Sequence, residues 1–344
     1  MDILKTVYEN TIRRGTADLG SGRGMDIWQW DEGVVLYGFS KAFEKTRDPQ
    51  ILDFMKMWLD YHIDRQDFGL SINTTAPLLG VLTLLEQGID KPTYRSLCKR
   101  FADWCMAEAP RADRGCFEHS CTANRYPNQI WADTLFMGCL FLCKWGLYTK
   151  EDMYVREAVR QFILHYQYLE DRETGLIFHG YYCDTREQKG VLWGRGNCWF
   201  AAASVELLDI LEEKTPGYET IREHFLRHIK AVLACQDASG AWHTVMNRPD
   251  TYLEMSATAA FAHAIDRGIK MGLLENQCQE NRNIAMEALR GDIDDNGNVL
   301  HGSLGTCVMD SYRDYDAIGV GFSYFTQGLA MMALSGEKPE EKAD

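Results

Sequence analysis

The chain has 344 residues, of which 46% are hydrophobic and 25% are charged, a composition typical of a globular protein with a large core. Its formal net charge of -14 disfavours nucleic acid and anionic membranes as partners, because both bind basic surfaces. A small anionic ligand held by a few local cations remains compatible with this charge. Because no apolar run reaches about 18 residues, we expect no membrane span.

The amino terminus lacks the continuous apolar core of a signal peptide, so we expect a cytoplasmic protein. The 11 cysteines are scattered, and several lie in apolar helical stretches. This pattern favours reduced thiols over disulfides. Cys139 and Cys143 share a helical face, but no second Cys or His pair with zinc-site spacing accompanies them. We therefore expect no metal site.

Helical periodicity recurs throughout the chain. Amphipathic segments, the expected outer helices, cover residues 2–14, 49–63, 91–109, 149–169, 217–236 and 276–290. They alternate with more uniformly apolar segments, the expected inner helices, at residues 32–46, 73–87, 131–147, 198–213, 255–271 and 320–335. Six such pairs without a linker predict one all-α domain over residues 1–336, built as a closed double ring. Residues 337–344 are expected to form a polar tail.

The connections differ in length. Short turns follow the inner helices, whereas long stretches precede them, at residues 15–31, 64–72, 110–130, 170–197, 237–254 and 291–319. The long loops therefore meet at one rim of the ring, and loops of this length are usually functional. The amino ends of the inner helices point to the same rim, where free N–H groups favour an anion. We expect a negatively charged ligand there.

Four of the long loops share a pattern that runs from a glycine turn through a short extended piece to a histidine, at residues 115–119, 175–179, 240–243 and 297–301. Such a pattern predicts a small hairpin in each loop. It also places four of the nine histidines at equivalent rim positions. Only one or two of them need contact a ligand.

Asp133 is the one acid in the stretch from Tyr126 to Gly146, at the head of a run that is apolar on every side. An aspartate at this position either caps the helix or serves in chemistry. The residues around it include Asn128, Gln129 and Trp131, which offer hydrogen bonds and a stacking face. From these residues alone, both interpretations stay open.

The second notable stretch, VLWGRGNCWFAAASVELLDIL, covers residues 191–211. Gly194 and Gly196 flank Arg195 and allow close approach of a ligand, while Trp193 and Trp199 supply flat apolar faces. Arginine can bind a carboxylate with two hydrogen bonds, and tryptophan faces suit sugar rings. The alternative is a glycine-rich turn with two core tryptophans.

The segments YPNQIWADTLFMG, TGLIFHG, WGRGNCWFAAASVELL and YLEMSATAAFAHAIDRGIKMGLL resemble the unsaturated glucuronyl and rhamnogalacturonyl hydrolases of glycoside hydrolase families 88 and 105, and family 105 more closely. The resemblance implies an (α/α)6 barrel, in which short β-hairpins occupy the rim loops. It implies removal of a 4,5-unsaturated uronic acid from the non-reducing end of lyase-generated oligosaccharides, without a cofactor. The matching residues are the catalytic Asp133 and the substrate-binding His179, Arg195, Trp199, Trp193, His119, Trp131 and Asn73.

In the chemistry that this resemblance implies, a neutral Asp133 protonates C4 of the C4=C5 enol ether. The carboxylate so formed helps water add at C5, and the hemiketal collapses to release the sugar. One carboxyl group serves both steps, unlike the pair of an ordinary glycosidase. Burial raises the pKa of such a group and a helix amino end lowers it, so the sequence leaves the pKa of Asp133 open.

The chain departs from the family pattern just before Asn73, where relatives often carry an aspartate and this sequence has none. Asp31 or Asp67 would be the substitute. Cys198 replaces a common glycine, which would narrow the pocket. Two rival functions remain: a sugar epimerase or isomerase that uses the rim histidines, and a noncatalytic sugar-binding relative. The aglycone, the linkage and the oligomeric state stay open.

Overall fold

The computed structural model describes residues 2–123 and 126–337. An outer ring consists of α1 (Ile3–Asp18), α3 (Pro49–Arg65), α6 (Pro92–Ala107), α8 (Asp152–Leu169), α10 (Tyr218–Ala234) and α12 (Cys278–Gly291). The inner ring consists of α2 (Trp30–Thr46), α4 (Ile72–Thr75) with α5 (Leu78–Glu86), η3 (Leu135–Cys139) with α7 (Leu140–Thr149), α9 (Gly194–Ile210), α11 (Met255–Lys270) and α14 (Tyr324–Ser335). Each predicted helix is therefore present.

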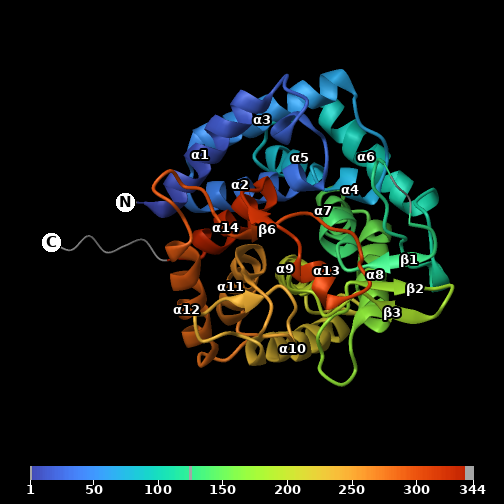
Figure 1. Ribbon diagram of the computed structural model, residues 1–344. Coiled ribbons are helices and arrows are strands. Elements are labelled where there is room, and N and C mark those ends of the chain that lie inside the picture. The colour runs from blue at the N-terminus through green and yellow to red at the C-terminus, as the bar shows by residue number, and fades with distance from the viewer. Residues whose placement is uncertain (1, 124–125, 338–344) are drawn as a thin grey trace.

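The inner ring closes on itself. Neighbours pack in the order α2, α5, α7, α9, α11 and α14, and α14 packs back against α2. Figure 1 shows this double ring, with α1 packed beside α14 where the ring closes. The predicted (α/α)6 barrel is confirmed. Of the predicted tail at residues 337–344, only Glu337 belongs to the described residues, and its carboxylate pairs with Arg290.

The helices of the two rings differ in how much of their surface is buried, as the periodicity predicts. Helix α9 is buried on all sides from Gly194 to Leu208, whereas α10 buries one stripe that contains Ile221, Phe225 and Ile229. A helix that is apolar on all sides is stabilised by complete burial, whereas an amphipathic helix keeps its polar face in water. The apolar inner helices therefore line the middle, and the outer helices cover them.

Two glycines allow the ring to close tightly between α2 and α14. A Cβ atom added to Gly38 would lie 2.4 Å from the carbonyl oxygen of Gly328. One added to Gly328 would lie 2.6 Å from the carbonyl oxygen of Val34. Both distances are below van der Waals contact, so the two backbones can approach this closely only without side chains.

Short antiparallel pairs occur in the rim loops. The bridges Arg111–Phe117, Glu170–Ile177 and Ile293–Val299 and the strand pair that contains Trp242 lie in the four loops with predicted hairpins, which confirms them. Strands β1 (Gln129–Trp131), β2 (Gly180–Tyr182) and β3 (Glu187–Lys189) form one sheet, β4 (Trp242–His243) pairs with β5 (Leu253–Glu254), and β6 (Gly302–Ser303) pairs with β7 (Val320–Gly321). Three short helices also lie in these loops, η1 (Gly24–Asp26), η2 (Asp113–Gly115) and α13 (Tyr312–Asp316). The register of β1 and β2 places Trp131 opposite Gly180, next to His179.

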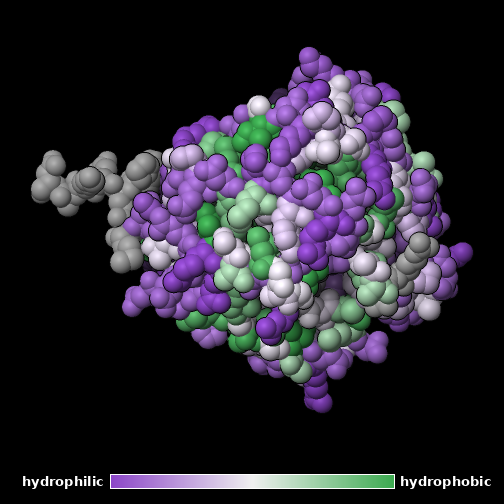
Figure 2. Space-filling model, turned by 90° about the horizontal axis from the view of Figure 1, so that it is seen from above, coloured by the Kyte–Doolittle hydropathy of each residue, from purple (hydrophilic) through white to green (hydrophobic). Residues whose placement is uncertain are grey.

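Hydrophilic side chains dominate the face seen in Figure 2, where apolar groups form small separate patches. Within residues 2–123 and 126–337, none of the helices combines the length and the apolar character that a bilayer span requires.

Candidate active site

Asp133 lies at the irregular start of the third inner helix. It directly follows β1, and the helix opens with the π-helical turn η3 rather than a regular α-helical turn. Such π-turns occur frequently at functional sites. The Asp133 side chain is 16% exposed, and its Oδ2 atom has no hydrogen-bond partner among the described residues. In that part of the chain no hydrogen bond joins this carboxylate to a backbone N–H group, which argues against a capping role.

His179 is brought to Asp133 by the β1–β2 pairing. The Ala132 N–H donates to the His179 carbonyl oxygen at 2.9 Å, which fixes the two loops beside each other. The His179 Nε2 atom then lies 3.4 Å from Asp133 Oδ2. The histidine has no exposed surface. A predicted catalytic residue and a predicted binding residue from separate loops are thus neighbours.

The pKa of Asp133 is set by two opposing effects. Burial alone raises it, but His179, His119 and Arg195 outweigh burial and hold the pKa below the ordinary value of 3.8. Burial lowers the pKa of His179, and the Asp133 carboxylate offsets this only in part. Near neutral pH the free protein therefore carries an Asp133 carboxylate beside a neutral imidazole.

Arg195, at the amino end of α9, is almost fully buried. Its Nη1 and Nη2 atoms donate to the carbonyl oxygens of Ser303 and Leu304, each at 2.7 Å. The guanidinium carbon lies 4.4 Å from the ring centroid of Trp193 and 4.9 Å from that of Phe325. The Nε atom has no partner among the described residues. The cation is held rigidly, with N–H groups left for an anionic ligand.

The three predicted tryptophans surround this pair in different ways. The Trp193 ring packs on His179 at a centroid distance of 4.1 Å, and Trp131 meets the same histidine edge-on at 5.4 Å. Trp199 has no exposed surface and packs against Phe136 at 5.3 Å. Trp193 and Trp131 therefore line the site directly, whereas Trp199 supports it from below. Direct contact of Trp199 with a substrate stays a prediction.

His119 stacks on Trp131 with ring centroids 4.6 Å apart and an interplanar angle of 7°. Its Nδ1 atom lies 3.2 Å from the Thr134 hydroxyl, one residue beyond Asp133. Burial lowers the pKa of His119 to about 4, so it is neutral at physiological pH. His119 therefore contributes a neutral ring to the wall of the site.

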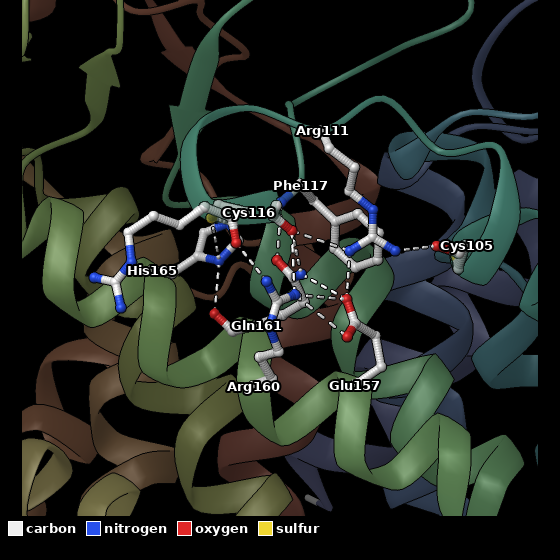
Figure 3. A network of polar contacts seen from close by, with 10 residues as sticks. Cys105, Arg111, Cys116, Phe117, Glu157, Arg160, Gln161 and His165 are labelled. Carbon is white, nitrogen blue, oxygen red and sulfur yellow. Dashed lines mark hydrogen bonds and ion pairs between the residues drawn. The ribbon is translucent and has the colours of Figure 1, made fainter.

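The loop that carries His119 is held by outer helix α8, as Figure 3 shows. Gln161 accepts from the Phe117 N–H at 2.8 Å and donates to the Gly115 carbonyl oxygen at 2.9 Å. Arg111 pairs with Glu157 and also donates to the Cys105 carbonyl oxygen at 2.6 Å. This network fixes the loop from the outside, and with it the position of His119.

Asn73 lies in α4, close to the position where relatives often carry an acid that this chain lacks. Helix α4 packs against η3, and the Asn73 Oδ1 atom is buried without a hydrogen-bond partner among the described residues. Asp67 pairs with Arg65 at 2.8 Å. Asp31 accepts from the Phe325 N–H, and burial raises its pKa to about 7, with Arg195 opposing the rise. Of the two predicted substitutes for the missing acid, Asp31 is the one that interacts electrostatically with Arg195 in the site.

Not all of the predicted rim histidines contact the site around Asp133. His243 bonds to the Thr251 carbonyl oxygen at 2.5 Å, and the side chain of His301 is 58% exposed. Sequence patterns also missed Tyr315, whose hydroxyl lies 2.6 Å from His179 Nδ1. Its segment has no periodicity and no glycine-to-histidine pattern that would have indicated a place in the site.

A cavity of about 390 Å³ lies on the outside of α8 rather than at Asp133, where Arg114, Arg156 and Arg160 line it. Among residues 2–123 and 126–337, no cluster of His, Cys, Asp and Glu side chains has the arrangement of a metal site. The chemically distinctive site is therefore the narrow rim around Asp133.

An (α/α)6 barrel whose rim joins a largely buried carboxylate, a buried arginine and flat aromatic rings has the character of a carbohydrate-active enzyme. Aromatic faces bind sugar rings, and the arginine attracts an acidic sugar.

Comparison with known proteins identifies the family. Residues 5–337 match Glycosyl Hydrolase Family 88. The unsaturated rhamnogalacturonyl hydrolase YesR of Bacillus subtilis (strain 168) is 30% identical over 314 residues, which are 90% of this chain and 89% of the relative. The crystal structure of a possible member of the GH105 family from Salmonella enterica has a TM-score of 0.91 at 31% identity, over 97% of this chain and 92% of that chain.

The fold extends to more distant structures. The unsaturated glucuronyl hydrolase from Bacillus sp. GL1 has a TM-score of 0.74 at 17% identity, over 97% of this chain and 94% of that chain. The chain belongs to glycosyl hydrolase family 88, and it is a glycosidase. The predicted family is confirmed.

Proposed function

We propose that the enzyme removes a 4,5-unsaturated uronic acid from the non-reducing end of oligosaccharides made by polysaccharide lyases, with an unsaturated rhamnogalacturonan disaccharide as the preferred substrate. The relative with 30% identity over 90% of the chain is an unsaturated rhamnogalacturonyl hydrolase, which supports this substrate class. The single observation that carries the reaction is the Asp133 carboxylate, which is 16% exposed at the rim and has its Oδ2 atom 3.4 Å from His179 Nε2.

Asp133 is the acid and base of the proposed reaction. Its carboxyl proton goes to C4, the C4=C5 electron pair forms the new C–H bond, and positive charge develops at C5 and the ring oxygen. Water then adds to C5 while the Asp133 carboxylate takes the water proton. The resulting hemiketal opens and releases the sugar at C1. Proton transfer by one positioned group suits both steps.

The low pKa of Asp133 in the free enzyme fits the base step, but the acid step needs a proton on this group. A uronate carboxylate that enters beside Asp133 adds a second negative charge, and a like charge raises the pKa of a carboxyl group. Substrate binding therefore supplies the condition for protonation. Arg195, with its unpartnered Nε atom, is the proposed partner of the uronate carboxylate.

His179, Trp193, His119, Trp131, Trp199 and Asn73 are proposed to shape the sugar-binding site. We also propose a cytoplasmic location. The buried cysteines of the helices, Cys139 and Cys143 among them, are free thiols, which supports a reducing compartment.

The decisive experiment follows the loss of enol-ether absorbance during incubation with unsaturated rhamnogalacturonan and glucuronan-type disaccharides. The wild type should bleach the rhamnogalacturonan disaccharide, and Asp133→Asn should not. Binding measured by calorimetry without any bleaching would instead favour a noncatalytic sugar-binding protein. Activity retained by Asp133→Asn but lost in His179→Gln would favour proton transfer by histidine, as in an epimerase.

A further inference from the structure

The segment between β6 and β7 crosses the rim and carries the short helix α13. In Figure 1 this orange-red segment passes from β6 toward β1 and β2 and returns through α13. Two contacts place it on the β1–β2 sheet. The Cys307 Sγ atom lies 3.2 Å from the Tyr126 hydroxyl, and a Cβ atom added to Gly180 would lie 2.9 Å from Val308. The segment therefore covers the loops that carry Asp133 and His179.

Tyr315 is the residue of α13 that reaches the site. It has no exposed surface and packs with Trp193 and Val245 in a small apolar cluster apart from the main core. Its hydroxyl accepts from the Met309 N–H at 3.1 Å and lies 2.6 Å from His179 Nδ1. Gly190 makes room for it, because a Cβ atom there would lie 2.6 Å from the hydroxyl oxygen.

The hydrogen-bond pattern assigns the proton positions on His179. The Tyr315 oxygen already accepts from Met309, and in the described part of the chain Nδ1 of His179 is its one hydrogen-bond acceptor. A buried hydroxyl that donates to Nδ1 leaves that nitrogen without a proton, so the neutral ring carries its proton on Nε2. The Nε2–H then lies beside the Asp133 carboxylate, with Nε2 at 3.4 Å from Oδ2 and neither atom hydrogen-bonded among the described residues. The opposite tautomer would direct a lone pair at the carboxylate.

We propose that Tyr315 is a positioning residue, whose hydroxyl fixes the Nε2–H tautomer of His179 and thereby places an N–H group beside Asp133. The structural part of this proposal stands on the contacts alone, and its catalytic consequence rests on the proposed function. An N–H group beside Asp133 stabilises the carboxylate that forms when the proton leaves for C4. Loss of the Tyr315 hydroxyl should therefore slow the chemical step more than it weakens binding.

Other charged or titratable groups also face His179. They are the Asp133 carboxylate, the Arg195 guanidinium and His119, besides the Tyr315 hydroxyl. Arg195 and Asp133 act oppositely on the protonation of His179. The Asp133 carboxylate favours a proton on Nε2 through its charge, and Tyr315 is the one described side chain that hydrogen-bonds to Nδ1.

The test compares Tyr315→Phe, which removes one oxygen atom and keeps the ring, with wild type. Tyr166→Phe is the matched control, because Tyr166 is equally buried and its hydroxyl bonds to Ser204 at 2.9 Å, away from Asp133. Nitrogen NMR shifts of labelled histidine report which ring nitrogen carries the proton, and the signal lost in His179→Gln identifies His179. We expect Nε2–H in the wild type and in Tyr166→Phe, and a mixture of tautomers in Tyr315→Phe.

The kinetic readout separates positioning from a merely structural role. For Tyr315→Phe we expect kcat to fall on the order of tenfold, the effect of one lost hydrogen bond, with KM within about twofold of wild type. An Nδ1–H tautomer in the wild type overturns the proposal, as does an unchanged tautomer with unchanged kcat in Tyr315→Phe. If the wild type bleaches no unsaturated disaccharide, the proposed function fails, while the NMR measurement still decides the tautomer.

Discussion

The Nη1 atom of Arg195 donates to the carbonyl oxygen of Ser303 at 2.7 Å, although the two residues are 108 positions apart in the chain. The bond ties the amino end of α9 to β6, in the last rim loop. Glu254, which caps α11 through Ser256 and Ala257, also accepts from the Ser303 N–H at 3.4 Å. Three rim loops thus hold the proposed carboxylate-binding arginine in one orientation before a substrate arrives.

Arg195→Lys should lower kcat/KM on the order of 100-fold, because an ammonium group cannot bond two carbonyl oxygens and a ligand in the same plane. Stability should also fall by about 1–3 kcal/mol, since Ser303 or Leu304 loses its donor. Steady-state kinetics and urea unfolding check both expectations. Arg222→Lys is the control, because Arg222 pairs with Glu219 on the exposed side of α10 and should affect neither quantity. Wild-type kcat/KM in Arg195→Lys would disprove the assignment of this arginine.

The pH dependence of the reaction should differ between free and bound enzyme. The pKa of Asp133 is below 3.8 in the free enzyme, so the protonated form becomes scarcer as the pH rises above that value. We expect kcat/KM, which reports the free enzyme, to fall with rising pH from about 4 upward. The kcat profile should fall only at a higher pH, because the bound uronate raises the pKa of Asp133.

Initial rates between pH 4 and pH 8 on the unsaturated disaccharide provide this measurement. Far-ultraviolet circular dichroism at each pH separates a loss of rate from a loss of fold. If kcat and kcat/KM fell at the same pH, the uronate would not be acting on Asp133 as proposed.

Acid should destabilise the fold through buried histidines. Burial lowers the pKa of His119 and His165 to about 4 and that of His228 to about 3. In the unfolded chain these groups titrate near 6.5, so between that pH and their folded pKa the unfolded state binds more protons. The free energy of unfolding should therefore fall as the pH drops below about 6.5, by up to roughly 3 kcal/mol for each histidine at pH 4.

Urea unfolding at pH 7 and pH 5 tests this dependence. His165→Gln should reduce the difference in unfolding free energy between the two pH values, because it removes one buried histidine that the unfolded chain protonates. An equal difference in wild type and His165→Gln would show that other groups cause the acid sensitivity.

Sequence periodicity predicted the helices well because burial itself creates that pattern. Helix α9 is apolar on every side since it is surrounded, and α10 is striped since one face meets water. The family resemblance assigned Asp133 and His179 to one site, but periodicity did not predict the β1–β2 pairing that brings them together, because it depends on how two loops meet in space. Tyr315 was missed for the same reason: its role depends on a contact with His179, 136 positions away.

A buried charge cluster at Glu206 joins three inner helices and should be important for stability. The Glu206 carboxylate on α9 is 2.7 Å from Lys41 Nζ on α2 and 2.7 Å from His263 Nε2 on α11, and it accepts from the Tyr37 hydroxyl. Burial opposes its charge, but Lys41 and His263 outweigh burial and hold the pKa of Glu206 well below 4.5. The ionised Glu206 carboxylate therefore stabilises the fold above about pH 4.5. This stabilisation is lost when acid protonates the carboxylate in the folded protein.

Glu206→Gln keeps the shape of the side chain but leaves Lys41, whose side chain is 13% exposed, without its buried counter-charge. Breaking a buried ion pair from one side costs about 3–5 kcal/mol, which should appear in urea unfolding at pH 7. The double change Glu206→Leu with Lys41→Met should cost less than the sum of the two single changes, because it removes both charges together. Glu9→Gln is the control, since Glu9 and Lys5 form an exposed pair with side chains 47% and 53% exposed. If the losses of unfolding free energy in the two single variants summed to the loss in the double variant, Lys41 and Glu206 would not be energetically coupled.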